Sequence, residues 1–454
     1  MTRGLALAVT IGAVFAAVAS RFPVNDSDLF WQLQIGRWVV DHGALYTHDT
    51  FSSTLGGTPV PVNQWLGQVI LWLAFAVGSW WGVLAVRVVT VFVLATVTAW
   101  AAIARSSRPA IGAVAAFPGL ALSRFVWADR PELLGLALFA IFVPTALAAR
   151  GGDRRAQVGL VALMALWPNV HGGFVVGVVL LAVLGLEAAI FAQAERRRAF
   201  LGFTALAILA TFLNPLGAGV YASPEWHFAN PPRFIQEWGV PDVTTFPGLL
   251  FATTLLGALA LALLRPSGRT AEAAILAPLA FLSLAALRHM PLFAIASAPF
   301  LAERISALWP RLASRGRARE PWIVAAPLAT VVLVAALVSA PREPDLSGYP
   351  VGALDALHAH DGALFNEYDW GGFLVWFAPE HPVFIDGRLE PYAAAILDDY
   401  REAIGAHARW SAVLDKWRIG LVLVRPASAL AVRLREAGWS SLYRDDDTVL
   451  LSRP

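Results

Sequence analysis

The sequence of 454 residues contains no cysteine, and only 15% of its residues are charged. Without cysteine the protein has no disulfide framework, no thiolate nucleophile and no zinc–thiolate site. Soluble globular proteins carry roughly 25% charged residues, so the charge content is low for that class. The sequence also gives no indication of nucleic-acid binding, because its basic clusters are short, lie beside apolar segments and lack interleaved aromatic residues.

The missing charge is explained by repeated apolar runs of roughly 17 to 25 residues, the length that crosses a bilayer core. The sequence therefore predicts a mainly α-helical, polytopic membrane protein with about eleven spans. The predicted spans are residues 4–20, 82–104, 110–125, 131–149, 156–168, 173–192, 199–213, 246–264, 272–287, 290–306 and 322–340.

Arginine is concentrated at one end of these spans. If the N-terminus is cytoplasmic, every inside loop is basic, as the positive-inside rule requires. The arginines of the predicted inside loops are Arg3, Arg105, Arg108, Arg150, Arg154, Arg155, Arg196, Arg197, Arg198, Arg265, Arg269, Arg304, Arg311, Arg315, Arg317 and Arg319. This distribution predicts that the C-terminal part of the chain is extracytoplasmic.

Residues 65–78 are apolar enough to form a further span, but that span would place the arginines at 150–155 outside. We therefore predict an interfacial or re-entrant helix, with Trp65 and Trp72 at the level of the headgroups.

The first apolar run has an alternative interpretation as a cleaved signal peptide. Ala17, Val18 and Ala19 resemble a signal-peptidase cleavage site.

The region after the last span is predicted to form a second domain. Turn signals bracket strand-like runs at 363–366, 382–386, 420–424 and 448–452, and helical patterns cover 350–360, 393–417 and 428–437. The alternation predicts a small α/β layer. The predicted domains are therefore residues 1–340, a transmembrane domain whose first external loop with interfacial helices spans 21–81, and residues 341–454, an extracytoplasmic α/β domain.

Two acids, Asp26 and Asp28, follow the first predicted span. In an extended segment, side chains two positions apart project to the same face. Such a carboxylate pair can coordinate a hard cation such as Mg²⁺ or Mn²⁺, or hold a proton that one member releases. The alternative is that Asp28 caps the helix that starts near Leu29, whereas Asp26 is free of capping.

An Asp-x-Asp motif at this position, in a long external loop with interfacial helices, resembles the GT-C superfamily of integral-membrane glycosyltransferases. Residues 26–33, 36–38, 47–52 and 64–66 look like those of an uncharacterised bacterial branch of that superfamily, and so do residues 364–372 and 384–388. Tyr368-Asp369-Trp370-Gly371 is loosely similar to the Trp-Trp-Asp-Tyr-Gly motif of oligosaccharyltransferase soluble domains, but the residue order differs.

The resemblance implies a GT-C-like helical bundle with an extracytoplasmic domain, in the bacterial inner membrane. It implies transfer of a sugar from a polyprenyl-phosphate donor to a glycan, lipid or protein acceptor, by a single displacement that inverts the anomeric carbon. The protein would also contact membrane lipids.

The resemblance also assigns roles to individual residues. Asp26 or Asp28 is the expected catalytic base or metal ligand. The residues expected to bind the donor phosphate are Arg288 as first choice, Arg130 as second choice, and His289. The residues expected to bind substrate are Asp49, His171, Tyr368, Asp369, Trp370 and Arg388. Each has a structural alternative: an arginine can be an interfacial anchor or the partner of a nearby acid, His171 can belong to a helix-start turn, and Asp49 can be a turn residue.

Two other classes of protein compete with an enzyme. A transporter would carry ionisable groups at mid-membrane depth and paired repeats, and neither is visible in the sequence. A non-catalytic scaffold of envelope glycan assembly would use the C-terminal domain as its working part.

Overall fold

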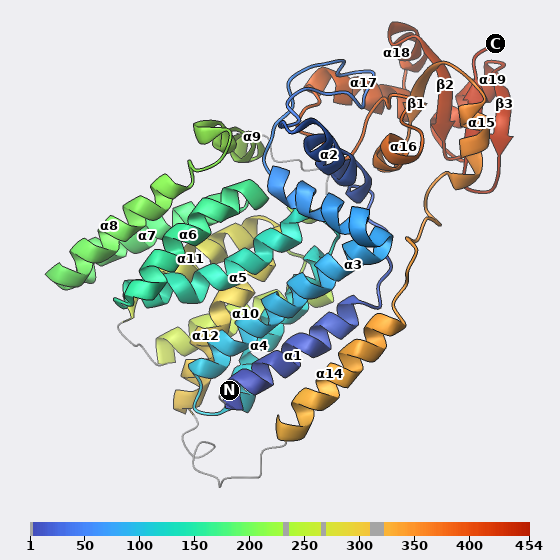
Figure 1. Cartoon of the computed structure of the whole chain (residues 1–454). Coiled ribbons are helices and arrows are strands. Elements are labelled where there is room, and N and C mark those ends of the chain that lie inside the picture. Colours follow the sequence, from blue (N-terminus) through green and yellow to red (C-terminus); the bar gives the residue numbers. More distant parts are fainter. Residues whose placement is uncertain (1–2, 230–235, 265–268, 309–321) are drawn as a thin grey trace. The chain divides into compact units, whose positions relative to one another are not determined.

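We describe a computed structural model of the chain for residues 3–229, 236–264, 269–308 and 322–454. The chain divides into two compact units. The helical unit comprises Met1–Pro23 and Trp81–Arg342, and the mixed unit comprises Val24–Trp80 and Glu343–Pro454. The elements of both are labelled in Figure 1.

The helical unit is a bundle of apolar helices. Its described helices are α1 (Arg3–Ala19), the part of α3 (Trp65–Ala104) that follows Ser79, α4 (Pro109–Ser123), α5 (Pro131–Arg150), α6 (Arg154–Val170), α7 (Phe174–Phe191), α8 (Ala194–Ala210), α9 (Ala222–Ala229), α10 (Phe246–Leu264), α11 (Thr270–Ala285), α12 (Met290–Leu308) and α14 (Trp322–Val338). Short 3₁₀ turns lie at Arg124–Val126 (η1), Gly217–Tyr221 (η2), Gln236–Trp238 (η3) and Leu287–His289 (η4).

All predicted spans fall on helices, but not all of these helices have the length and hydropathy of a membrane span. Among the described residues, six helical segments are long and apolar enough to cross a membrane: Trp65–Ala104, Pro109–Val126, Pro131–Arg150, Phe174–Phe191, Phe246–Leu264 and Leu287–Leu308. Shorter apolar helices cover Gly4–Ala19, Thr270–Ala285 and Ala329–Val338. Helices α6 and α8 belong to neither group, because charged residues occupy their first turns.

The core of the helical unit is built from large aromatic side chains and from glycines at helix crossings. Phe139, Phe142 and Trp167 are almost completely buried. A Cβ atom added at Gly119 of α4 would lie 3.0 Å from the backbone of Ile295 in α12. Glycine at this position therefore allows the two helices to approach closely, which is typical of packing within membranes.

The helix that starts at Trp65 is broken at Ser79, whose φ of 51° and ψ of −144° are not helical. Residues up to Trp80 belong to the mixed unit, and those from Trp81 belong to the helical unit. A separate helix over residues 65–78 was predicted, and the break confirms that separation. Its interfacial or re-entrant position stays a prediction.

The mixed unit contains a four-stranded sheet and short helices. Its helices are α2 (Leu29–His42), the first part of α3, α15 (Leu354–His358), α16 (Gly371–Phe377), α17 (Ala394–Ile404), α18 (Trp410–Lys416) and α19 (Ala429–Glu436), with 3₁₀ turns at Val351–Ala353 (η5) and Tyr368–Trp370 (η6). Its strands are β1 (Ala363–Asn366), β2 (Ile419–Val424), β3 (Ser440–Arg444) and β4 (Val449–Ser452), in the order β1-β2-β4-β3. The pair β1–β2 is parallel, and the other two pairs are antiparallel.

One predicted strand, residues 382–386, is wrong. The N–H of Val383 donates to the carbonyl of Phe51 (3.0 Å), and the N–H of Ser53 donates to the carbonyl of Val383 (2.9 Å). This segment therefore forms a single bridge to the first loop and does not join the sheet. Strand β3 was not predicted, because its residues are mostly exposed and show no apolar alternation.

The first loop and the C-terminal segment share one core, although the sequence analysis assigned residues 21–81 to the transmembrane domain. The ring of Phe30 packs edge-on against Tyr349, Phe373 and Phe377, with centroids 5.4 to 5.9 Å apart. The side-chain amide of Gln34 donates to the carbonyl of Val375. Helix α2 therefore buries its apolar face against α16, and these contacts join Val24–Trp80 and Glu343–Pro454 into one unit.

Replacing Phe30 by alanine is expected to destabilise the mixed unit by about 3–5 kcal/mol, because it removes a fully buried ring from this cluster. The measurement is the thermal midpoint of the purified full chain, together with trypsin cleavage between residues 24 and 80. The matched control is Phe281→Ala, since Phe281 is 73% exposed. Equal midpoints for the two variants would contradict a shared core.

Candidate functional site

At the start of α2, the two acids of the Asp-x-Asp motif make hydrogen bonds that the sequence did not predict. Asp28 occupies the N-cap position of α2, but its carboxylate makes no capping hydrogen bond. Its Oδ1 instead accepts a hydrogen bond from the indole N–H of Trp31 (3.1 Å). Asp26, which was expected to be free of capping, accepts the backbone N–H of Asp28 (2.8 Å). Asp28 therefore does not cap α2 with its side chain, and Asp26 bonds the backbone of the N-cap residue instead.

The Asp28 carboxylate lies against the backbone of the C-terminal segment. A Cβ atom added at Gly387 would collide with its Oδ1, and one added at Gly372 would collide with the carbonyl oxygen of Ser27. Position 372 therefore requires glycine for steric reasons, and a side chain at 387 would force the Asp28 carboxylate to move. The residues 364–372 and 384–388, which carried part of the family resemblance, thus contact the Asp-x-Asp loop directly.

Asp49 and Arg388, two predicted substrate-binding residues, form a buried ion pair. Their side chains are 0% and 5% exposed, and Arg388 Nη1 lies 2.6 Å from Asp49 Oδ1. Arg388 Nη2 lies 2.6 Å from Asp386 Oδ2. Burial lowers the pKa of Arg388, because it disfavours the charged guanidinium. The nearby Asp386, Tyr392 and Asp49 outweigh this effect and raise the pKa of Arg388 well above its ordinary value. The geometry supports a structural role, and substrate contact by Asp49 or Arg388 stays a prediction.

The other residues predicted on the acceptor side lie in η6, beside a polar cavity of about 290 Å³. Trp370 is buried and donates its indole N–H to the carbonyl of Gly348 (2.9 Å), whereas Asp369 is 67% exposed. The hydroxyl of Tyr368 donates to the carbonyl of Gly387 (3.4 Å). The cavity is lined by Asn25, Ser27, Asp345, Ser347, Gly348, Tyr349, Asp369 and Trp370.

The sequence analysis missed the four cavity residues of the segment before η5: Asp345, Ser347, Gly348 and Tyr349. They follow the last predicted span and carry no recognisable motif. The hydroxyl and the N–H of Ser347 bond to the carboxylate of Asp345 and lower the pKa of Asp345. The hydroxyl of Tyr349 donates to the carbonyl of Asn25 (3.1 Å). The lining of the cavity therefore includes two acids, Asp345 and Asp369, and the hydroxyl side chains of Ser27, Ser347 and Tyr349.

The predicted phosphate-binding arginines lie in the helical unit, around an acid that the sequence analysis did not assign. Arg288 Nη2 lies 2.7 Å from Glu132 Oε1, and Arg288 Nη1 lies 3.1 Å from Glu237 Oε1. Arg130 and His171 are close enough to Glu132 to interact with it electrostatically. We name this group, Arg130, Glu132, His171, Glu237 and Arg288, the Arg288 cluster.

Local backbone structure positions the members of the Arg288 cluster. Arg130 is the N-cap residue of α5, and Glu132 stands in the first turn of the same helix. His171 packs over Gly135, where an added Cβ would lie 2.8 Å from its Nδ1. Arg288 lies in η4, with its guanidinium 4.8 Å from the centre of the Trp238 ring. The only sequence signal for Glu132 was its place beside Arg130.

His289 is held by the end of α11. Its Nδ1 lies 3.1 Å from the carbonyl oxygen of Leu282, and its own carbonyl accepts the hydroxyl of Ser283 (2.8 Å). These contacts support a helix-terminating role, and the phosphate-binding role of His289 stays a prediction.

Arg87, which lies inside the predicted span 82–104, forms a buried ion pair that was also missed. Arg87 Nη1 lies 3.2 Å from Asp129 Oδ2, and the two side chains are 4% and 2% exposed. Arg87 also donates to the carbonyl of Phe22 (2.5 Å). The pair therefore connects α3 to the segment before α5 and to the end of α1.

The metal site at Asp26 and Asp28 stays a prediction. In the described part of the chain, no three His, Asp or Glu residues are grouped so that they could hold a metal ion. Mg²⁺ is often bound by one or two carboxylates together with substrate phosphates and water, so Asp26 and Asp28 would have to bind it in that way.

Replacing Arg388 by glutamine is expected to lower the stability of the mixed unit by about 3–5 kcal/mol, because it leaves the carboxylates of Asp49 and Asp386 buried without their cation. Thermal unfolding of the full chain measures the effect. Arg401→Gln is the matched control, since Arg401 forms an exposed pair with Asp398 worth about 0–1 kcal/mol. A loss no larger than that of the control would show that the buried pairs contribute nothing.

The fold of the chain is similar to that of solved membrane enzymes. The structure of the Archaeoglobus fulgidus oligosaccharyltransferase tethered with an acceptor peptide matches with a TM-score of 0.57 at 13% identity, over 99% of this chain and 74% of that chain. ArnT from Cupriavidus metallidurans bound to undecaprenyl phosphate matches with a TM-score of 0.57 at 14% identity, over 98% of this chain and 97% of that chain.

No family model and no curated protein matches the sequence. The structural matches cover nearly the whole chain, and the predicted mainly helical architecture with a small C-terminal sheet is confirmed. Together with the apolar helices, they identify a multi-pass membrane protein with the GT-C-like fold that the sequence resemblance predicted.

Proposed function

We propose that the protein is a membrane glycosyltransferase that moves a sugar from a polyprenyl-phosphate donor to a glycan, lipid or protein acceptor on the extracytoplasmic face of the bacterial inner membrane. The GT-C-like fold over nearly the whole chain carries this proposal. One similar structure contains undecaprenyl phosphate, and another contains an acceptor peptide.

In the proposed reaction an acceptor hydroxyl attacks the anomeric carbon of the donor. The new bond joins the acceptor oxygen to that carbon, the bond from the carbon to the phosphate oxygen breaks, and the polyprenyl phosphate leaves with the electron pair. A carboxylate must accept the hydroxyl proton. We assign this role to Asp28 first, because its carboxylate is oriented by Trp31 and by Gly387 and is not used for capping. Asp26, held by a backbone N–H, is the second candidate.

The cavity beside η6 is the proposed acceptor site. Asn25 and Ser27, the neighbours of the two acids, line it together with Asp369 and Trp370. Carboxylates and hydroxyls can bond to sugar or peptide groups, and an aromatic wall favours a sugar face.

Arg288 is the proposed phosphate ligand, because its planar guanidinium suits bidentate binding of phosphate. Its two carboxylate partners differ: Glu132 is 22% exposed at 2.7 Å, and Glu237 is 41% exposed at 3.1 Å. We infer that Glu132 keeps the guanidinium in place, whereas Glu237 occupies donors that the phosphate would take over.

Asp28→Asn is expected to reduce sugar transfer by about 10²–10⁴-fold, because an amide cannot accept the proton of the acceptor hydroxyl. Its side-chain oxygen can still accept the indole N–H of Trp31, so folding should be retained. The measurement is consumption of lipid-linked sugars by membranes containing the protein, followed by mass spectrometry of the total polyprenyl-phosphate-sugar pool.

Asp41→Asn is the matched control, since Asp41 lies in α2, the helix that Asp28 precedes, and is an exposed partner of Arg37. Treatment with EDTA separates the two predicted roles of the acids, because a pure base does not need Mg²⁺ or Mn²⁺. Normal transfer by an Asp26→Asn, Asp28→Asn double variant would favour the scaffold interpretation.

Arg288→Gln is expected to lower kcat/KM by about 10²–10³-fold through loss of charge stabilisation on the leaving phosphate. Glu237→Gln is expected to tighten donor binding, because it removes the charge that competes with the phosphate for Arg288. Initial rates at varied donor concentration separate these effects. Arg154→Gln, at the start of α6 and four residues beyond the end of α5, controls for general loss of positive charge. Weaker donor binding by Glu237→Gln would refute the exchange of ligands.

A further inference from the structure

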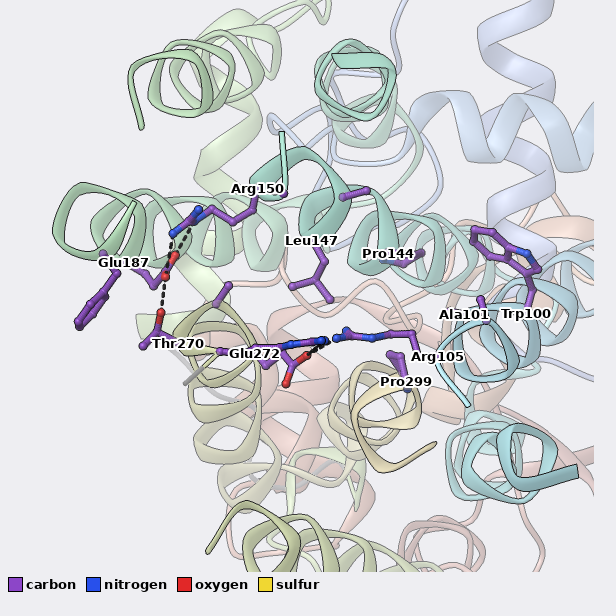
Figure 2. Close-up of a pocket in the computed structure, with 16 residues that line it drawn as sticks. Trp100, Ala101, Arg105, Pro144, Leu147, Arg150, Glu187, Thr270, Glu272 and Pro299 are labelled. Atoms are coloured by element: carbon purple, nitrogen blue, oxygen red, sulfur yellow. Dashed lines mark hydrogen bonds and ion pairs between the residues drawn. The ribbon is translucent and has the colours of Figure 1, made fainter. Parts of the chain in front are cut away.

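A cavity of about 710 Å³ lies among helix ends of the helical unit (Figure 2), and its lining includes no residue of the Arg288 cluster. Its walls come from the ends of α3, α5 and α7, the start of α11, and α12. These are the helix ends that the arginine distribution predicts to be cytoplasmic. Apolar side chains form part of the wall, among them Trp100, Leu147 and Phe191.

One side of the cavity carries an arginine held by a buried acid. Arg150 Nε lies 2.7 Å from Glu187 Oε2, and Arg150 Nη2 donates to Glu187 Oε1 at 3.0 Å. The hydroxyl of Thr270 also donates to Glu187. Glu187 is only 7% exposed, and Arg150 is 15% exposed. Arg150 is therefore fixed in orientation at the cavity wall, as Figure 2 shows.

A second arginine group faces the same space. Arg105 Nη2 lies 2.5 Å from Glu272 Oε1 and 2.7 Å from Glu303 Oε2. Arg269 also pairs with Glu303 (2.7 Å) and is 49% exposed. The first turn of α11 connects both groups, because Thr270 contacts Glu187 and Glu272 contacts Arg105.

The charged residues that line the cavity are Arg105, Arg150, Arg269, Glu187 and Glu272. Their ion pairs also include Glu303 and Arg304. The network therefore has four arginines and three glutamates, which gives one positive charge in excess. A ligand that matches this lining combines one negative charge with an apolar part that covers the aromatic and aliphatic wall. A free anion would leave that wall uncovered, and a neutral lipid would leave the excess charge unmatched.

We propose that this cavity binds an anionic phospholipid of the membrane leaflet on that side. The phosphodiester would lie among Arg105, Arg150 and Arg269, and the first part of an acyl chain would cover Trp100 and Phe191. Basic pockets between transmembrane helices on the cytoplasmic side are a recurrent mode of anionic-lipid binding. The proposal is independent of the sugar-transfer reaction, since it concerns other residues and another lipid.

Native mass spectrometry of the delipidated full chain, titrated with phosphatidylglycerol and with phosphatidylcholine, tests this binding. Wild-type protein is expected to bind one phosphatidylglycerol at least about tenfold more tightly than phosphatidylcholine. Ala148→Trp fills the cavity from an exposed wall position without changing charge, and Arg105→Gln removes the excess charge. Each is expected to weaken phosphatidylglycerol binding by about tenfold.

Two matched variants control for bulk and for charge. Ala199→Trp adds the same bulk on α8, and Arg154→Gln removes a charge at the start of α6, and neither residue lines the cavity. Both should bind phosphatidylglycerol as wild type does. A thermal midpoint for each variant distinguishes lost binding from lost folding, and a folded Ala148→Trp variant with full affinity would overturn the proposal.

Additional ligands distinguish the sources of the anion. If glycerol 3-phosphate or inorganic phosphate binds as tightly as the lipid, the cavity is a site for a free anion and the proposal is refuted. Undecaprenyl phosphate that binds more tightly than phosphatidylglycerol, and is lost in Ala148→Trp, would also refute it and would place a polyprenyl-phosphate site at this end of the bundle. Equal binding of phosphatidylcholine would refute the charge argument.

Discussion

The buried pairing of Arg388 with Asp49 and Asp386 is the interaction on which the mixed unit depends most. It joins a residue of the first loop to two residues far along in the chain. A buried charge is stable only if a charge of opposite sign lies at short range, and Arg388 lies 2.6 Å from each of the two carboxylates. The pairing therefore requires the first loop to fold together with the C-terminal segment, and it explains why Val24–Trp80 belongs to the same compact unit as Glu343–Pro454.

This shared folding gives the Asp-x-Asp loop a rigid support. Glycines at 372 and 387 let the C-terminal backbone touch the loop, and the aromatic contacts of Phe30 fill the space beneath it. A catalytic carboxylate must be held within a fraction of an ångström of its productive position. The C-terminal domain is therefore better understood as part of the support of the loop than as a separate attachment.

In the helical unit, two helices carry polar groups at both of their ends. Helix α5 begins with Glu132 of the Arg288 cluster and ends with Arg150 at the large cavity. Helix α11 begins at that cavity with Thr270 and Glu272, and η4 with Arg288 follows its last turn. Isolated charges near a membrane are costly, and each of these arginines is accompanied by an acid from a different helix.

The sequence by itself determined the helices, the separation of residues 65–78 from the following span and most of the α/β content after residue 341. These features depend on local properties: the length of apolar runs, proline and glycine signals, and side-chain alternation. The sequence also identified Arg130, His171 and Arg288 as candidates, because ionisable residues beside apolar runs are conspicuous. Only the tertiary structure decided the partners. It placed Glu132 and Glu237 on Arg288, gave Asp26 and Asp28 hydrogen-bond partners outside a helix cap, and paired residues 382–386 with the first loop. Such pairings depend on which segments, often hundreds of residues apart, come together in space, and no local pattern encodes that.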